Sequence, residues 1–97
     1  MSSLLICFND KAERYLVDVT DLVRCYIDHK CSPGIDTHNV ILEYADKETA
    51  QIYDFTIKCN DNQIARKIYD RVCESYLNHP GIIDLRDIDV SLEDIVE

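Results

Sequence analysis

Two cysteines and two histidines are the residues of this sequence best suited to hold a metal ion. They fall within fourteen positions of the chain: Cys25, His29, Cys31 and His38. Thiolate and imidazole are ligands that zinc prefers, but structural zinc sites usually space them as C-x2-4-C and H-x3-5-H. The spacing here is C-x3-H-x-C-x6-H, and Cys25 falls within a predicted helix. We therefore expect no metal ion and no other cofactor.

The remaining cysteines lack the surroundings of a catalytic nucleophile. A reactive thiol needs a nearby imidazole and an electropositive setting. Cys73 lies on the apolar edge of a predicted helix, and Cys7 and Cys59 lie in predicted strands. Carboxylates are numerous, but no glycine-rich loop accompanies them to form a pocket. We expect no catalytic residues and predict that the protein is not an enzyme.

The cysteine count and the absence of long apolar runs indicate a cytoplasmic, reducing environment. Five cysteines are an odd number, and most lie inside apolar runs, which favours reduced thiols over a disulfide framework. The apolar run at residues 4–8 is too short for a signal peptide and follows no basic residue. A transmembrane helix needs about 20 apolar residues, and the sequence contains no such stretch.

The charge balance favours a protein partner. Ten Lys and Arg against nineteen Asp and Glu give a net charge of -9, which disfavours nucleic acid and anionic membranes. We expect no direct contact with nucleic acid or membrane, and a protein partner with a basic surface. A second copy of the chain is a further option. At 97 residues, the chain has room for one domain, so we expect residues 1–97 to form a single unit.

The acidic charge is concentrated near the C-terminus. Residues 82–97 contain six acids and one base, and apolar residues alternate with them. Two interpretations are open: an acidic docking surface for a basic partner, and an edge strand whose charges prevent aggregation. We select five candidate partner-binding residues from this segment: Asp84, Asp87, Asp89, Glu93 and Asp94.

Tyrosines supply a second set of candidates. The chain has six Tyr, two Phe and no Trp, and tyrosine is enriched at protein interfaces. Tyr69 and Tyr76 lie on the apolar stripe of a predicted helix, so we expect them in the core. Tyr15, Tyr44 and Tyr53 are the predicted interface tyrosines.

Hydrophobic periodicity predicts a hairpin and a helix in the first half of the chain. Residues 3–8 and 14–19 form the hairpin, because apolar residues alternate and a polar break separates them. Thr20 then caps a helix with apolar residues at helical spacing, which Pro33 and Gly34 end. Residues 35–39 form a loop.

The second half predicts another hairpin, another helix and a last strand. Residues 40–44 and 51–58 alternate as paired strands. Asn60 and Gln63 resemble a capping box at the start of a long amphipathic helix, which ends at residues 78–81. Residues 83–90 form a last strand, bulged where the alternation changes phase. Ser91 starts a short turn with Asp94 at the capping-box position.

This order, β-β-α-β-β-α-β, resembles the ubiquitin-like β-grasp roll, in particular its Ras-association and PB1 members. The resemblance is carried by the first hairpin, the Thr20-capped helix and the Ser32-Pro33-Gly34 loop ahead of Val40. It implies an α+β interaction domain. A ferredoxin-like split βαβ with an extra strand is the alternative. The PB1 acidic motif is incomplete, because Thr49, Ala50 and Gln51 follow Asp46 and Glu48.

The sequence therefore predicts a non-enzymatic adaptor or scaffold domain that binds a partner through sheet edges and an acidic surface. The alternative is a small acidic inhibitor or immunity-type protein that mimics the charge of nucleic acid. Such an inhibitor displaces DNA or RNA from its target enzyme, and an adaptor does not. A third class, a small enzyme dependent on a metal or thiol, would require the cysteine and histidine group to be functional.

Overall fold

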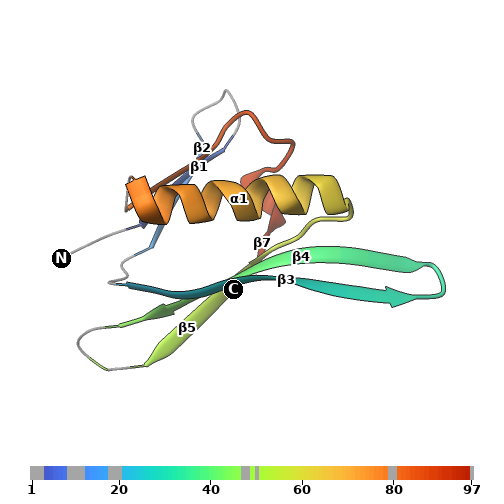
Figure 1. Cartoon of the computed structure of the whole chain (residues 1–97), viewed down its shortest axis with the longest axis horizontal. Coiled ribbons are helices and arrows are strands. Elements are labelled where there is room, and N and C mark those ends of the chain that lie inside the picture. The colour runs from blue at the N-terminus through green and yellow to red at the C-terminus, as the bar shows by residue number, and fades with distance from the viewer. Residues whose placement is uncertain are drawn as a thin grey trace.

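The computed structural model describes residues 4–8, 13–17, 21–46, 49, 51–78 and 81–96. The chain forms two sheets and one long helix in the described part (Figure 1). The elements are β1 (Leu4–Phe8), β2 (Glu13–Val17), β3 (Asp21–Ser32), β4 (Ile35–Ala45), β5 (Ile52–Ile57), α1 (Asn62–Asn78), β6 (Ile82–Leu85), a 3-10 turn η1 (Leu92–Asp94) and β7 (Ile95–Val96). The predicted α+β class is confirmed.

The strands pair in two separate groups. The small sheet has the order β2-β1-β6, in which β1 is antiparallel to β2 and parallel to β6. The large sheet has the order β3-β4-β5-β7 and is antiparallel throughout. The two predicted hairpins are confirmed as β1–β2 and β4–β5.

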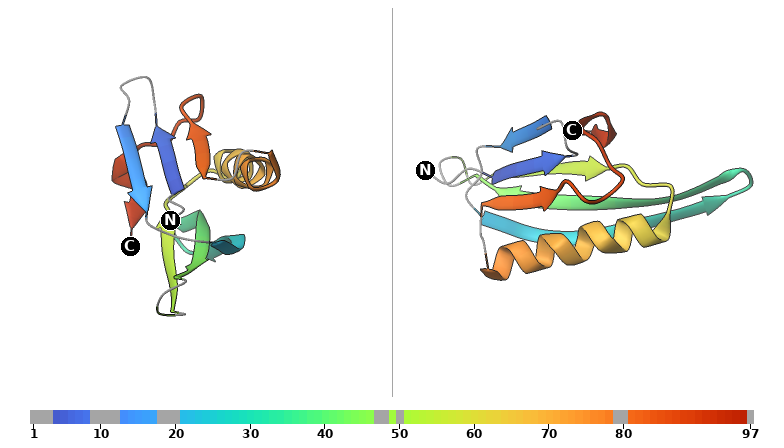
Figure 2. Two further views of the ribbon diagram at one scale, coloured as in Figure 1. Left: turned by 90° about the vertical axis from the view of Figure 1, so that its left-hand side faces the viewer. Right: turned by 90° about the horizontal axis from the view of Figure 1, so that it is seen from above.

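The hydrophobic core lies between the two sheets and α1 (Figure 2). Alternate residues of β4 are buried, as the period of a strand requires, and the same holds for Ile6 and Phe8 on β1. The helix buries Ala65, Ile68 and Val72, which are spaced three and four apart. The two sheets and the helix therefore share one apolar interior.

The predicted long helix is confirmed as α1. The carboxylate of Asp61 accepts a hydrogen bond of 2.7 Å from the backbone N–H of Gln63, so the cap is Asp61 and not Asn60. After the helix, Gly81 has a φ of 102°, a backbone conformation that residues other than glycine rarely adopt. No helix in the described ranges is long and apolar enough to cross a membrane.

The helix predicted from Thr20 to Ser32 is wrong, because residues 21–32 form β3. Its predicted cap, Thr20, lies outside the described residues. Cys25 and Ile27 pack on the core from alternate positions, which is strand spacing. Pro33 and Gly34, taken as a helix stop, make the two-residue turn of a hairpin in which Ser32 pairs with Ile35. Gly34 has a φ of 80°, as the second central residue of a type II turn requires.

With β3 in place of a helix, the order of elements differs from the predicted one. The predicted loop at residues 35–39 is the first part of β4, and five strands precede the helix. The predicted order β-β-α-β-β-α-β is therefore not the observed one, and the ferredoxin-like alternative also requires a second helix.

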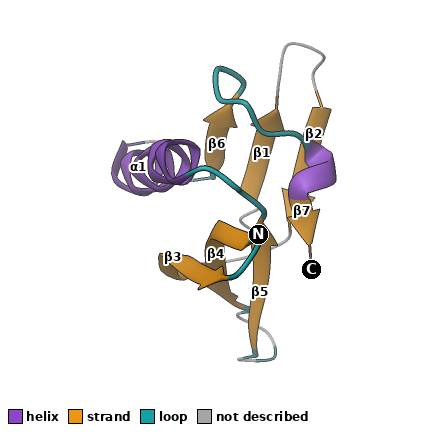
Figure 3. Cartoon of the chain, turned by 90° about the vertical axis from the view of Figure 1, so that its right-hand side faces the viewer, coloured by secondary structure: helices purple, strands orange, loops and turns teal. Residues whose placement is uncertain are grey.

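The C-terminal segment also differs from the prediction. β6 ends at Leu85. Ile88 and Val90 are buried as predicted, but they lie in the irregular segment that follows β6 and not in a strand. The predicted short turn is confirmed as η1, with Ser91 and Asp94 forming a capping box. After it, β7 pairs with β5 and closes the large sheet, on the side of the small sheet away from α1 (Figure 3).

Candidate functional site

The β3–β4 hairpin projects beyond the body of the protein. Its far end, residues 28–39, is here called the arm, and it extends past the end of α1 (Figures 1 and 2). It contributes to a long axis of 43 Å, against 30 and 23 Å for the other two. Residues 29–36 are all exposed, so this part of the hairpin contributes little to the core.

Four polar side chains gather on one face of the arm. His29 pairs directly with His38, and Cys31 pairs directly with Asp36. Residues two apart on a strand point to the same side, and directly paired residues of antiparallel strands share a face. These four residues, His29, Cys31, Asp36 and His38, are called the polar cluster.

The groups of the polar cluster converge on the Asp36 carboxylate. Its Oδ1 lies 2.8 Å from the Nε2 of His29 and 3.3 Å from the Nε2 of His38. The two imidazole rings stack with centroids 4.0 Å apart and planes inclined by 15°. The ligand atoms of His29, Cys31 and Asp36 all lie within 4.8 Å of one another. The cluster therefore brings nitrogen, sulfur and oxygen donors to one point.

The base of the arm is hydrogen-bonded to the body of the protein, whereas its end is exposed to solvent. His38 is only 8% exposed, and its backbone N–H donates to the carbonyl of Cys59 at 2.8 Å. The backbone N–H of Cys59 in turn donates to the side chain of Asn39 at 3.2 Å. His38 is thus held by the body, whereas the other three members of the cluster face solvent.

The charge state of Asp36 suits a ligand for a cation. The hydrogen bond from His29 lowers the pKa of Asp36 below its ordinary value of 3.8, and the charges of His38 and His29 act in the same direction. The carboxylate is therefore ionised at neutral pH.

The structure changes the membership of the group seen in the sequence. Cys25 lies on the same face of β3 but packs against the core, and burial raises its pKa to about 12. Its thiol is protonated at neutral pH. Asp36, which we did not select from the sequence, takes its place. The repeated spacings H-x-C and D-x-H on either side of Pro33-Gly34 were the signal that could have revealed the pairing.

The acidic C-terminal candidates are largely used within the protein itself. Arg86 lies 2.9 Å from the Asp84 carboxylate, and its hydrogen bonds lower the pKa of Asp84 to about 2. Arg71 makes two hydrogen bonds to Asp87, at 2.8 and 2.9 Å, which lower the pKa of Asp87. The carboxylate of Asp94 accepts the backbone N–H of Ser91 at 3.0 Å. These three acids therefore hold local structure.

The other two acidic candidates are exposed. Asp89 follows the turn after β6, and Glu93 lies in η1. Neither takes part in an ion pair with another residue that the structure describes. The acidic surface left for a partner is therefore smaller than the sequence indicates.

The division of the tyrosines into buried and exposed residues differs from the prediction. Tyr44 is 1% exposed and packs on Phe55, with ring centroids 5.2 Å apart, so its selection as an interface residue is wrong. Tyr53 is 48% exposed, as an interface residue must be, and its hydroxyl donates to Gln51. The side chain of Tyr15 lies outside the described residues. Tyr76, predicted for the core, is 58% exposed on α1.

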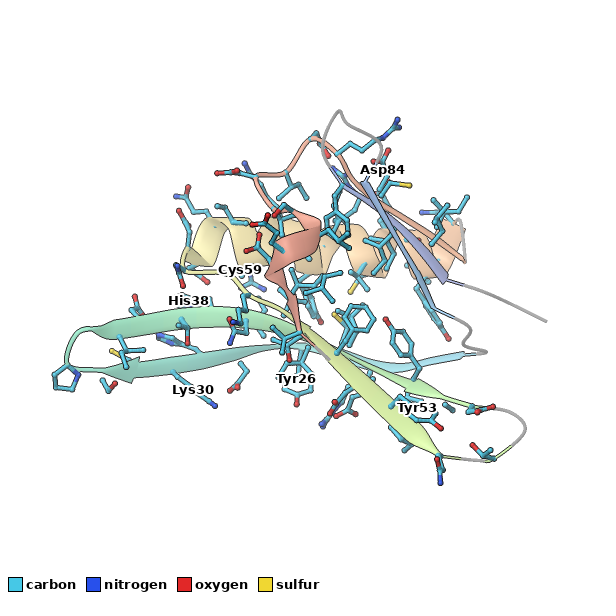
Figure 4. All side chains as sticks on the ribbon, turned by 180° about the vertical axis from the view of Figure 1, so that it is seen from behind. Tyr26, Lys30, His38, Tyr53, Cys59 and Asp84 are labelled. Atoms are coloured by element: carbon cyan, nitrogen blue, oxygen red, sulfur yellow. The ribbon has the colours of Figure 1, made fainter. Side chains whose placement is uncertain are left out.

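Tyr26, which we did not select, lies on the face of the large sheet that points away from α1 (Figure 4). It pairs across the strands with Ile41, which pairs with Thr56, which pairs with Val96. These four residues, called the outer row, cross all four strands and share one face. All are partly or fully exposed, and the guanidinium of Arg24 lies 4.4 Å from the Tyr26 ring centroid.

All five cysteines carry free thiols. Burial raises the pKa of Cys59 to about 11, with the neighbouring carboxylates of Asp94 and Asp61 acting in the same direction. Cys59 and Cys25 are therefore protonated and poor nucleophiles at neutral pH. The cysteine exposed beside imidazole groups, among the residues the structure describes, is Cys31.

Comparison of the chain with protein-family models, with curated protein sequences and with solved structures gave no match. The function of the chain is therefore inferred from its own residues.

Proposed function

We propose that this protein is a non-enzymatic interaction domain that binds a protein partner through the outer face of the large sheet. The observation that supports the proposal is the outer row, Tyr26, Ile41, Thr56 and Val96. α1 and the small sheet pack on the opposite face of this sheet, and no described element lies over the outer row (Figure 1).

The composition of this face suits an interface better than simple solvation. An antiparallel sheet often leaves one face in water, and that face then carries polar residues. Here its centre holds an aromatic and two aliphatic side chains, while the flanking positions are charged. An apolar centre with a polar rim is the usual anatomy of a protein interface.

The charges at the rim favour a basic partner. Glu43 and Asp54 are directly paired across β4 and β5, so two carboxylates stand side by side next to the outer row. Arg24 pairs with Glu43 at 2.9 Å and leaves Asp54 exposed. The net charge of -9 also attracts a cationic partner over longer distances. Asp89 and Glu93 remain candidates for such steering.

β3 is an edge strand of the large sheet among the described residues, and its edge adjoins this face. β3 ends the order of the large sheet, and a partner strand can pair with such an edge. The β-grasp resemblance required a helix where β3 lies, so this function is supported by the residues of the sheet alone.

The test is a comparison of captured partners. Tagged wild-type protein and an Ile41→Glu variant are used to capture proteins from a lysate, with Tyr76→Ala as a control for loss of an exposed aromatic side chain elsewhere. We expect a salt-sensitive partner that Tyr76→Ala retains and Ile41→Glu loses by more than tenfold. Each variant is first checked by circular dichroism and thermal unfolding.

A partner retained by Ile41→Glu would contradict the outer-face proposal. If the partner is a nucleic-acid enzyme that releases DNA or RNA when the protein is added, the inhibitor class is correct instead.

A further inference from the structure

We infer that the arm binds one divalent transition-metal ion of the zinc type, held by the polar cluster of His29, Cys31, Asp36 and His38. The site lies on the face of the β3–β4 hairpin opposite to that of the outer row. It is therefore independent of the proposed partner surface.

The donor atoms select the class of metal. Calcium and magnesium are held by oxygen ligands alone, whereas zinc accepts thiolate, imidazole and carboxylate together. Two imidazole nitrogens, one thiolate and one carboxylate complete a four-coordinate shell. A shell filled by protein ligands is typical of structural zinc, which binds without leaving a position for a substrate.

The donor atoms already lie near one another, and rotation of the side chains, including the two stacked imidazole rings, would bring them into such a shell. Bond lengths in tetrahedral zinc sites separate ligand atoms by about 3.3 to 3.6 Å. The Nε2 of His38 lies 3.3 Å from Oδ1 of Asp36, which already agrees. The Nε2 of His29 lies 2.8 Å from the same oxygen, so this pair has to open slightly. The Cys31 thiol lies within 4.8 Å of the donor atoms of His29 and Asp36 and is exposed, so it can rotate inward.

The charges around the polar cluster favour a bound cation. The one Lys or Arg of the arm is Lys30. Strand alternation places it on the opposite face, where its Nζ lies 3.8 Å from the Asp28 carboxylate. No Lys or Arg ion pair involves Asp36 in the described part of the chain, and the two histidines bond to it instead. A metal ion replaces these hydrogen bonds with coordination to the same atoms. The thiol proton leaves to solvent, and each imidazole proton leaves Nε2 by exchange with solvent, so that the neutral ring carries its proton on Nδ1.

The position of the site indicates that a bound metal ion stabilises the hairpin. The end of the arm has only two strands, and a two-stranded hairpin is marginally stable alone in water. Two ligands come from β3 and two from β4, so the ion joins the strands just beyond the body. Metal binding is then coupled to ordering of the arm.

The experiment is a titration of the reduced full chain with Co²⁺, followed by displacement with Zn²⁺. We expect one equivalent of cobalt to give the absorption of a tetrahedral ion and a thiolate-to-cobalt charge-transfer band. Zinc then removes both. Cys31→Ser abolishes the charge-transfer band, and Asp36→Asn weakens zinc binding by at least about tenfold. The two controls, Asp28→Asn on the other face of the arm and Cys73→Ser on α1, leave both signals unchanged.

Three results would overturn the inference. The first is the absence of cobalt uptake by a chain that circular dichroism shows to be folded. The second is a charge-transfer band that survives Cys31→Ser or disappears in Cys73→Ser. The third is saturation at half an equivalent, because the site would then lie between two chains.

Discussion

The arm and the C-terminal segment both contain many titratable residues, but they use them in opposite ways. In the C-terminal segment, Asp84 and Asp87 are each paired with an arginine, and Asp94 caps the η1 turn. In the arm, Asp36 is surrounded by histidines and a cysteine, and the only lysine lies on the other face. The first region pairs its carboxylates with arginine, whereas the second gathers nitrogen, sulfur and oxygen donors around one carboxylate that forms no ion pair with a Lys or Arg among the described residues.

The comparison shows that the number of charges in a segment is a poor guide to the surface it offers. An acid that forms a bidentate pair with arginine already has its charge balanced and an acceptor site of each oxygen occupied. A smaller group of mixed donors without a permanent counter-ion is better placed to take a ligand. Function is therefore more readily assigned to the arm than to the segment with the larger charge.

The largest expected difference between the two regions concerns packing. Leu85 is fully buried on β6, so Leu85→Ala should destabilise the fold by about 3 kcal/mol, through lost burial and the cavity left behind. Ile35 is 56% exposed at the tip of the arm, so Ile35→Ala should change stability by less than about 0.5 kcal/mol. Urea unfolding measures both. Similar losses for the two variants would contradict the division into a packed segment and an open arm.

A smaller effect is expected from the ion pairs of the C-terminal segment. Arg71 joins α1 to the turn after β6 through Asp87 and the backbone carbonyl of Asp84. Arg71→Met should cost about 1 kcal/mol, because the bidentate bond and the bond to the carbonyl are lost together. Arg66→Met, at an exposed position on the same helix, is the matched control. Equal midpoints of urea unfolding would show that Arg71 does not fix the segment.

The same ion pairs predict a dependence of stability on pH. The pKa of Asp84 is lowered from 3.8 to about 2, and that of Asp87 is lowered as well. Groups with depressed pKa values in the folded state stabilise it above their unfolded pKa, and this contribution is lost as pH falls through the folded value. The difference in urea midpoint between wild type and an Asp84→Asn, Asp87→Asn variant should be present at neutral pH and shrink between about pH 4 and pH 2. A difference that persists at the lowest pH would contradict the assignment.

The smallest effect is expected at the two exposed acids. Asp89 and Glu93 make no ion pair within the described residues, so Asp89→Asn with Glu93→Gln should alter stability by less than about 0.5 kcal/mol. The same variant should reduce the salt dependence of partner association, because long-range attraction to a basic surface is weakened. Calorimetry and binding at two salt concentrations provide the measurements. A clear loss of stability would show that these acids also serve the fold.

Much of the fold could be predicted from hydrophobic periodicity. The long stripe of α1 and the alternation in the two hairpins each specify one type of element, and the structure contains them. The prediction for the segment from Asp21 to Ser32 failed because its apolar residues fit both the period of a helix and the period of a strand. Leu22, Val23, Tyr26 and Ile27 match a helix, while Cys25 and Ile27 match a strand that faces the core. Only the pairing with β4 decides between them, and that contact is not local in sequence.

The polar cluster was seen only in part for the same reason: His29, Cys31 and His38 were grouped from the sequence, but with Cys25 in place of Asp36 and with no metal ion expected. On a helix, His29 and Cys31 point to nearly opposite sides, so a shared site with Asp36 has no geometric basis. On a strand, the same two residues lie on one face, and the turn at Pro33-Gly34 brings Asp36 and His38 opposite them. The burial of Tyr44 was equally inaccessible, since a tyrosine on an alternating strand fits either face until the position of the core is known.

The most direct test of the account is a zinc titration followed by amide chemical shifts in the ¹⁵N-labelled, reduced chain. We predict that the amide chemical shifts of residues 28–39 change and saturate at one equivalent of zinc. The amide chemical shifts of residues 82–96 should not change. Perturbations centred on the acidic C-terminal segment, or spread evenly over the cysteines of the body, would contradict the assignment of the arm as the site that binds a metal ion.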